Sequence, residues 1–240
     1  MISRYNNRAA DALRPVSIKR NISKNAYGSA LVRFGDTLVL CTATIEDRVP
    51  NWRKASGLGW VTAEYAMLPA ATDTRSQRER NGARGRTLEI ERLIGRSLRT
   101  VVDMAGLGGE VGVTVDCDVL QADGGTRSAS ITGAYIALHD ALQTWKEAGM
   151  ITSLPLIGQV AAVSVGLVDG EVLLDLDFEE DQRAEVDMNL VCDDQGNYIE
   201  IQGTGEKVSF SRHQLNGFLN FGETGLAELI RLQKEVLAHE

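Results

Sequence analysis

A glycine-rich turn at residues 124–127 carries the residue types best suited to chemistry in this chain. It reads Gly124-Gly125-Thr126-Arg127. Glycines let backbone N–H groups converge, and a helix start leaves its first N–H groups without partners inside the helix. Because Arg127 adds a guanidinium, Gly125, Thr126 and Arg127 could together bind an anion of phosphate size. A simple Gly-Gly turn with a Thr or Ser N-cap and a solvated arginine would explain the same residues.

The segments on either side of this turn predict a strand and a helix that position it. Valines and Cys117 alternate with polar residues over 111–119, which is typical of a half-buried strand. Apolar residues then recur at helical spacing, and we expect a helix from Ser130 to about Lys146. The turn therefore joins the end of a strand to the start of a helix.

A second candidate site is a run of seven carboxylates within residues 175–187. Its members are Asp175, Asp177, Glu179, Glu180, Asp181, Glu185 and Asp187. Converging carboxylates repel one another unless a cation lies among them, and oxygen ligands suit Mg²⁺ or Mn²⁺. Asp181 and Asp187 are the better metal candidates, since Asp187 begins a strand-like run. A solvated acidic loop remains the alternative.

Arginines are concentrated before and within the segment that follows residue 85. Residues 85–102 have apolar residues on one helical face, and Arg86 stands at the start of that helix. A cation there opposes the helix dipole unless an anion lies beside it, so Arg86 is a candidate phosphate ligand. Before it, residues 73–85 are almost devoid of apolar side chains and should be exposed and mobile. Arg75, Arg78 and Arg80 in this segment are candidate RNA contacts.

The charge of the chain is unevenly distributed. The net charge of −8 argues against nucleic acid binding, but residues 1–24 hold six Lys or Arg against one Asp, and residues 75–99 hold eight Arg against three Glu. These segments could follow phosphates of a nucleic acid. They could equally pair with the acidic remainder inside the fold.

The cysteines and the start of the chain indicate the compartment. Three widely spaced cysteines lie in strand-like runs (Cys41, Cys117 and Cys192), which favours buried reduced thiols. We find no secretory signal and no apolar run of membrane-spanning length, so we expect a cytoplasmic protein.

The rest of the pattern predicts an α+β fold in which strands followed by helices occur twice. Expected strands are 28–34 and 37–45 joined at Gly35-Asp36, 60–65, 160–168 and 171–176 joined at Asp169-Gly170, and 186–191 with 198–202. Two helices, about 211–220 and 225–238, close the chain. Three scattered histidines and the absence of Gly-x-Ser-x-Gly or Walker motifs exclude a histidine zinc site, a hydrolase elbow and a P-loop.

Five separated blocks resemble the ribonuclease PH family of phosphorolytic 3′→5′ exoribonucleases, also called tRNA nucleotidyltransferases. They are GLGWVTAEYAMLP (57–69), GRT (85–87), residues 116–134, EDQRAEVDMN (180–189) and EIQGTGE (200–206). The resemblance runs from about Leu13 to Gln233. It implies one domain over residues 1–240 with the duplicated β-α units of the ribosomal protein S5 domain 2-like fold, in halves of about 10–150 and 151–240.

The resemblance also implies an activity and roles for the candidate residues. Arg86 with Gly125, Thr126 and Arg127 would bind the attacking phosphate, and Asp181 with Asp187 would hold Mg²⁺ or Mn²⁺. The expected substrates are tRNA precursors and other RNA 3′ ends, and the expected assembly is a homohexamer built from dimers, with no membrane partner. A silent RNA-binding ring subunit and a hydrolytic two-metal nuclease are the competing hypotheses.

The segment 68–75 departs from the family pattern at two positions. Ala70 stands where the family often has arginine, and Asp73 stands where it often has histidine. RNA contacts near residue 70 therefore do not carry over directly.

Overall fold

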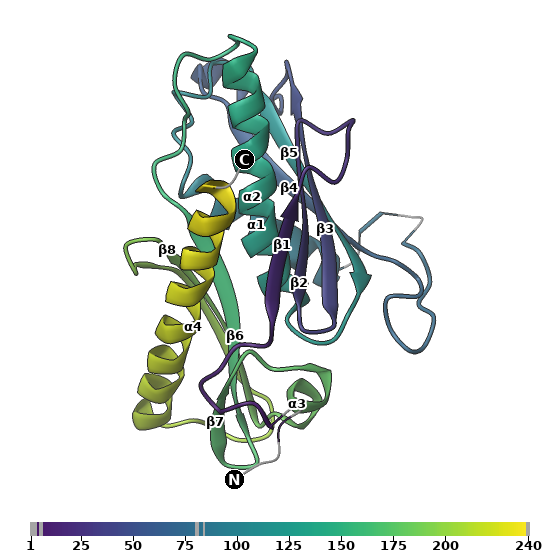
Figure 1. Ribbon diagram of the computed structural model, residues 1–240, viewed down its shortest axis with the longest axis vertical. Helices are drawn as coiled ribbons and strands as arrows, with labels where there is room; N and C mark the ends of the chain where they lie inside the picture. Colours follow the sequence, from purple (N-terminus) through teal and green to yellow (C-terminus); the bar gives the residue numbers. More distant parts are fainter. Residues whose placement is uncertain (1–3, 5–6, 80–81, 84, 239–240) are drawn as a thin grey trace.

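The first half of the chain forms a five-stranded sheet (Figure 1). The computed structural model describes residues 4, 7–79, 82–83 and 85–238. The sheet has the order β1-β2-β3-β5-β4, and its strands are β1 (Val16–Arg20), β2 (Gly28–Phe34), β3 (Thr37–Glu46), β4 (Trp60–Met67) and β5 (Gly112–Gln121). Strands β4 and β5 are parallel and are connected through α1 (Gly85–Arg99), whereas the other neighbours are antiparallel. The predicted hairpin at Gly35-Asp36 and the alternating strand before the turn are confirmed.

The second half forms an antiparallel sheet in the order β7-β6-β8-β9. Its strands are β6 (Val160–Val168), β7 (Glu171–Leu174), β8 (Val186–Asp193) and β9 (Tyr198–Gly205). Every residue of β6 is buried, which confirms its prediction as a central strand. Both predicted hairpins of this half are present.

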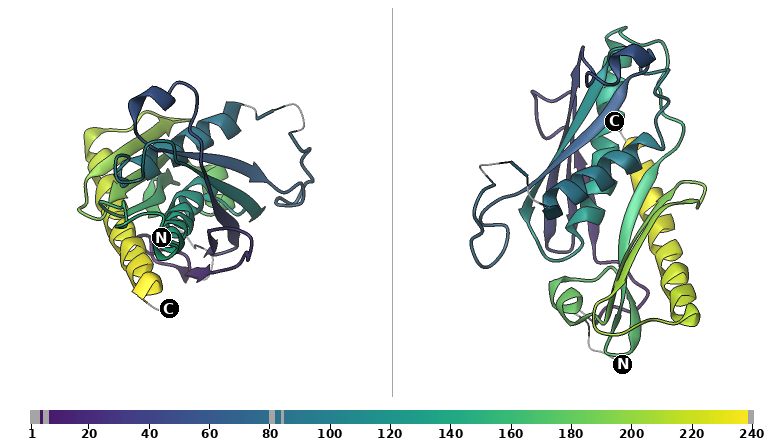
Figure 2. Two further views of the ribbon diagram at one scale, coloured as in Figure 1. Left: turned by 90° about the horizontal axis from the view of Figure 1, so that it is seen from above. Right: turned by 180° about the vertical axis from the view of Figure 1, so that it is seen from behind.

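Helix α2 (Thr126–Glu147) packs against β2, β3 and β5 of the first sheet and against β6 of the second (Figures 1 and 2). A Cβ on Gly133 would lie 2.4 Å from Val32 Cγ2, so only glycine allows this approach of helix and sheet. The helix begins at Thr126, not at Ser130 as predicted. Its first residues are small and polar yet buried, and apolar periodicity does not detect a helix that is buried on all sides.

The closing helix α4 (Arg212–Ala238) is continuous, and the prediction of two helices is wrong. Gly222 lies in the expected gap between the two helices and Gly225 begins the second one, and both are packing positions in α4. A Cβ on Gly222 would lie 2.1 Å from Leu190 Cδ1, and one on Gly225 would lie 2.9 Å from Leu174 Cδ1. They let α4 lie close to the second sheet instead of ending it.

Three short elements were not predicted, namely β1, a 3-10 helix η2 (Lys54–Ser56) and α3 (Phe178–Arg183). Helix α3 lies within the acidic run that suggested a loop. Its N-cap is Asp177, which accepts a hydrogen bond from the Glu180 N–H at 2.9 Å, while Glu180 accepts one from the Asp177 N–H. This capping box stabilises a helix too short to show apolar periodicity.

Sheets followed by long helices in both halves confirm the α+β class. The three cysteines are buried and free, as predicted. Among the described helices, none is sufficiently long and apolar to span a bilayer.

Candidate functional site

The glycine-rich turn lies directly against the segment that leads into α3. Gly124 and Gly125 both have left-handed φ angles, +69° and +63°. A Cβ on Gly124 would lie 2.6 Å from the Leu176 carbonyl oxygen and 2.7 Å from the Asp177 carbonyl carbon. The turn therefore requires glycine for both conformation and space, and it brings the candidate anion site next to the acidic segment.

Arg127 is held in place, so the alternative of a solvated arginine is wrong. Its side chain is 14% exposed, and its Nη1 donates to Gln202 Oε1 at 2.7 Å and to Glu89 Oε1 at 3.3 Å. Gln202 Nε2 also donates to Glu89 Oε1, at 2.7 Å. Strand β9 and helix α1 thus fix the guanidinium from two sides.

Thr126, the first residue of α2, is buried and accepts a hydrogen bond from the Tyr65 hydroxyl at 2.9 Å. Tyr65 is itself buried near the end of β4. Burial raises the pKa of Tyr65, so the phenol is neutral and acts as a donor. The end of β4 therefore supports the start of α2.

Asp187 on β8 lies within the electrostatic influence of Asp181 on α3. Burial and, after it, the nearby charge of Asp181 raise the pKa of Asp187 to about 6, against an opposing effect of Arg127. The pKa of Asp181 is also raised, by its own desolvation, while Arg86 and Arg127 lower it. Within the described part of the chain, neither aspartate forms an ion pair. Two close carboxylates without counter-ions form a site that attracts a cation.

Arg86 lies in the first turn of α1, as predicted, and is exposed. Its charge lowers the pKa of both aspartates and of Tyr65. The structure thus brings the predicted phosphate and metal residues together. Each residue comes from a different element: Arg86 from α1, Arg127 from α2, Asp181 from α3 and Asp187 from β8.

The predicted RNA contacts do not lie within this cluster. Arg75 and Arg78 are exposed on the loop after β4, which projects away from the body of the molecule (Figure 2). The base of this loop is held where the Ala122 N–H donates to the Ala71 carbonyl oxygen at 2.8 Å, and further along Glu79 accepts a hydrogen bond from the Thr87 hydroxyl at 3.2 Å. Arg80 lies outside the described residues.

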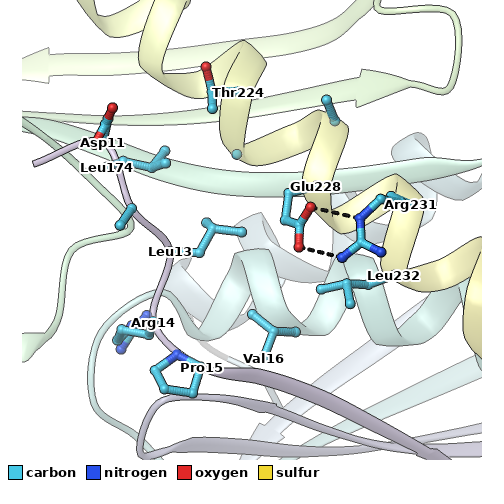
Figure 3. Close-up of a pocket in the computed structure, with 13 residues that line it drawn as sticks. Asp11, Leu13, Arg14, Pro15, Val16, Leu174, Thr224, Glu228, Arg231 and Leu232 are labelled. Atoms are coloured by element: carbon cyan, nitrogen blue, oxygen red, sulfur yellow. Dashed lines mark hydrogen bonds and ion pairs between the residues drawn. The ribbon is translucent and has the colours of Figure 1, made fainter. Parts of the chain in front are cut away.

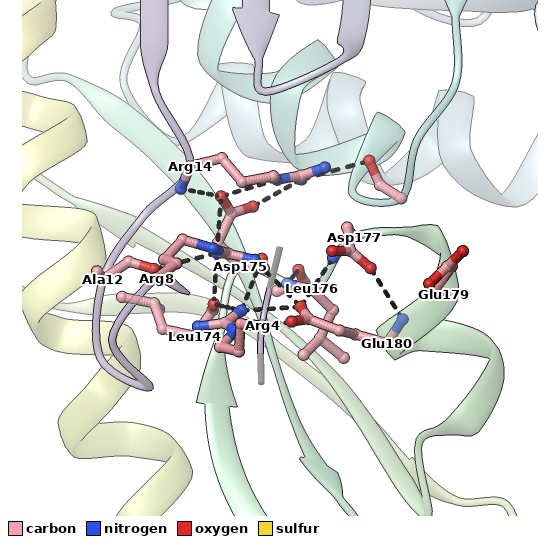
Figure 4. A network of polar contacts seen from close by, with 12 residues as sticks. Arg4, Arg8, Ala12, Arg14, Leu174, Asp175, Leu176, Asp177, Glu179 and Glu180 are labelled. Carbon is pink, nitrogen blue, oxygen red and sulfur yellow. Dashed lines mark hydrogen bonds and ion pairs between the residues drawn. The ribbon is translucent and has the colours of Figure 1, made fainter. Parts of the chain in front are cut away.

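Three other carboxylates of the acidic run, Asp175, Asp177 and Glu180, have structural partners (Figure 4). Glu180 is buried and accepts hydrogen bonds from Arg4 at 2.7 and 2.8 Å and from Arg8 at 3.1 Å. Asp175 is paired with Arg14. The basic N-terminal segment could either follow nucleic acid phosphates or pair inside the fold. Arg4, Arg8 and Arg14 do the second: they pair with acidic residues of the second half of the chain. Among the described residues, no group of three or more acidic, His or Cys side chains could hold a metal.

Two hollows flank the N-terminal segment, and neither contains the charged cluster. One, of about 680 Å³, lies between residues 11–16 and α4, where Glu228 and Arg231 form an ion pair (Figure 3). The other, of about 740 Å³, is lined by residues that include Asp36, Asp123 and Glu179. The candidate site is thus defined by converging charges and not by either hollow.

Sequence reasoning missed the residues that hold the site together. Tyr65 and Gln202 lie inside the blocks that carry the family resemblance, which was the signal available for them. Glu89 is three residues after Arg86 in α1, and Arg14 is one of six basic residues before position 25. Their partners are 38 and 161 residues away in the chain, which no local pattern reveals.

Comparisons with known proteins identify the family. A model described as 3′ exoribonuclease family, domain 1, matches residues 12–142, and the model for domain 2 matches residues 158–225. This chain belongs to the 3′ exoribonuclease family. Ribonuclease PH from Corynebacterium kroppenstedtii is 57% identical over 237 residues, covering 98% of this chain and 93% of that protein. Ribonuclease PH from Corynebacterium glutamicum (strain R) is 56% identical, covering 98% and 96%.

The fold of a 3′ exoribonuclease is also found among solved structures. A chain of the Archaeoglobus fulgidus exosome with RNA bound to the active site superimposes with a TM-score of 0.80, at 24% identity, over 94% of this chain and 91% of that one. The likeness confirms the α+β fold. Together with the ribonuclease PH relatives, the family membership makes this chain an enzyme that acts on RNA 3′ ends.

Proposed function

We propose that the cluster of Arg86, Arg127, Asp181 and Asp187 removes RNA 3′-terminal nucleotides with inorganic phosphate as the attacking group. The phosphate oxygen forms a bond to the terminal phosphorus, and the bond to the preceding 3′ oxygen breaks. The products are a nucleoside diphosphate and an RNA that is one residue shorter. Because a phosphoanhydride replaces a diester of similar free energy, the reaction also runs backward and adds nucleotides.

The observation that carries this proposal is the position of two guanidiniums opposite two carboxylates. A phosphate dianion must approach an anionic diester, so the nucleophile has to be held against charge repulsion. Arg127 is oriented by Gln202 and Glu89, and the first N–H groups of α2 lie beside it. Arg86 adds the second positive charge. A hydrolytic nuclease would have no use for such an anion site.

Asp181 and Asp187 fit a divalent cation such as Mg²⁺ or Mn²⁺. They supply hard oxygen ligands, and the pKa of each is raised, by burial and for Asp187 also by the charge of Asp181, a cost of ionisation that a cation relieves. Mg²⁺ usually takes one or two protein carboxylates and completes its shell with water and phosphate oxygens. When bound there, the ion would offset the charge that develops on the reacting phosphate oxygens.

We infer that the RNA reaches this site from the side of the loop after β4, and that Arg75, Arg78 and Arg80 contact its backbone. The exposure of Arg75 and Arg78 supports this.

We propose tRNA precursors as substrates, a homohexamer built from dimers as the assembly, and the cytoplasm as the compartment. The three free cysteines agree with a reducing compartment. We also propose that residues 1–240 act as one domain with two related halves, about 10–150 and 151–240.

The test is to identify the released nucleotide. The purified protein is incubated with a 3′-extended tRNA and Mg²⁺, with and without inorganic phosphate. We expect nucleoside diphosphates only when phosphate is present, and incorporation of nucleotides from diphosphates when they are in excess. Release of monophosphates in phosphate-free buffer would refute the proposal. Size determination of the same preparation tests the hexamer.

A further inference from the structure

Arg14 lies directly behind the glycine-rich turn. Its Nη1 donates to the Asp123 carbonyl oxygen, and its Nη2 lies 3.5 Å from the Gly124 carbonyl oxygen. A Cβ on Gly125 would lie 2.9 Å from the same Nη2. Arg14 is buried, at 6% exposure, so it cannot itself reach a phosphate in front of the turn.

Asp175 fixes the orientation of Arg14 (Figure 4). Asp175 Oδ2 accepts from the Arg14 backbone N–H at 2.8 Å and from Nε at 3.0 Å, and Oδ1 accepts from Nη2 at 2.7 Å. This bidentate geometry is the strongest that an arginine and a carboxylate can form. Burial alone would raise the pKa of Asp175, but Arg14 holds it below its usual range, so the pair is ionised.

The backbone of Asp175 shows that its side chain matters at this position. Asp175 has a φ of +54°, in the left-handed region that favours glycine, and it is 1% exposed. A strained backbone at a buried residue persists only when its surroundings hold it there. Here the hydrogen bonds to the side chain are those from Arg14.

The contacts of Arg14 determine which way the amides of the turn point. In a planar trans peptide the C=O and the following N–H point in opposite directions. Because Arg14 holds the carbonyls of Asp123 and Gly124, the N–H groups of Gly124 and Gly125 point away from it. Within the described part of the chain, these two N–H groups have no hydrogen-bond partner. Thr37 assists from the same side, since its Oγ1 donates to the Gly124 carbonyl oxygen at 2.6 Å and accepts from the Asp123 N–H at 2.9 Å.

We propose that Arg14, fixed by Asp175, is a positioning residue that aims the amide N–H groups of the turn at the attacking phosphate. It sets the affinity for phosphate without touching it. The inference rests on the proposed phosphorolytic function and assigns a role in that site to a residue of the N-terminal segment. A merely structural ion pair would stabilise the fold and leave the affinity for phosphate unchanged.

The test compares Arg14→Lys with Arg8→Lys. Arg8 is a matched control because it bonds to the Asp175 backbone carbonyl at 2.8 Å and lies 3.8 Å from its carboxylate, but does not contact the turn. Lysine keeps the charge of Arg14 but loses the planar fork that spans two acceptors. We expect Arg14→Lys to raise the KM for phosphate about tenfold, as loss of a group that orients ligands does elsewhere. The KM for RNA should stay within twofold, and Arg8→Lys should leave both values within twofold.

A second variant keeps the test decisive if Arg14→Lys folds poorly. Thr37→Val removes the hydroxyl group that donates to the Gly124 carbonyl oxygen. We expect this variant to raise the KM for phosphate by less than Arg14→Lys does. Added phosphate should also raise its melting temperature by less than that of the wild type. The inference would be overturned if both variants fold and keep the wild-type KM for phosphate. A fall in kcat with an unchanged KM for phosphate would also overturn it. Failure of the proposed function is seen separately, as nucleotide release by the wild-type protein without phosphate.

Discussion

Replacing Asp187 with asparagine should stabilise the protein while inactivating it. In the absence of metal, Asp187 is a half-buried carboxylate near a second one, with a pKa raised to about 6 from an ordinary value of 3.8. Keeping it ionised in the folded state therefore costs free energy. Asparagine has nearly the same shape and carries no charge, so Asp187→Asn removes this cost and also removes a proposed metal ligand.

The raised pKa of Asp187 determines both the size and the pH dependence of the expected stabilisation. A difference of one pKa unit corresponds to about 1.4 kcal/mol, so the shift from 3.8 to about 6 corresponds to at most about 3 kcal/mol, less with partial solvent exposure. Between these two pH values the folded state binds more protons than the unfolded state. Stability therefore falls as the pH rises from about 4 to 6, and the penalty is complete above 6. The gain in Asp187→Asn should be full at pH 8 and small near pH 4.

The measurement is urea unfolding in EDTA at pH 8 and at pH 4.5, at one protein concentration because assembly also contributes to stability. Asp193→Asn is the matched control, since it is the same change on the same strand. Burial would raise the pKa of Asp193, but hydrogen bonds from Asn197 hold it below its usual range. Asp193→Asn should therefore lose stability at pH 8. If Asp187→Asn is less stable than the wild type at pH 8 without metal, the ionised Asp187 carboxylate does not destabilise the fold. The argument for a cation between Asp181 and Asp187 then fails.

Three further substitutions test separate parts of the structure. Arg127→Ala should reduce phosphate-dependent turnover by at least about a hundredfold, measured as diphosphate release, with an unchanged circular dichroism spectrum, because it removes the charge that holds the nucleophile. Glu180→Gln should destabilise the fold by about 3 kcal/mol in urea, since it leaves buried Arg4 without its counter-charge; an unchanged midpoint would contradict this. Gly133→Ala should cost about 1 to 3 kcal/mol by the same assay, because the new methyl group overlaps Val32, and a neutral result would mean that α2 can shift.

Local sequence patterns predicted those parts of the fold whose cause is local. The β2–β3 hairpin, the alternation in β5 and the turn before α2 follow from periodicity and turn residues within a few positions. Helix α4 shows the limit of this reasoning. The sequence pattern predicted a gap between residues 220 and 225, whereas Gly222 and Gly225 lie inside one helix and allow the close approach of Leu190 on β8 and Leu174 on β7.

The candidate site likewise has a part that the sequence predicted and a part that it did not predict. Its candidate residues were predicted from residue type and family blocks, and the structure brings Arg86, Arg127, Asp181 and Asp187 together. The partners that orient them were not identifiable, because Arg127 meets Gln202 across 75 positions and Arg14 meets Asp175 across 161. Hydrogen bonds between distant segments leave no periodic signal in either one.

The acidic run shows why composition alone could not separate metal ligands from structural carboxylates. Seven acids within thirteen positions look equivalent in sequence. In the fold, Asp175, Asp177 and Glu180 each have a partner that cancels charge or caps a helix. Asp181 and Asp187 have no such partner among the described residues, and both have raised pKa values, first through burial and for Asp187 also through the charge of Asp181. The basic N-terminal segment thus neutralises Asp175 and Glu180, whereas Asp181 and Asp187 keep charges that a cation would offset.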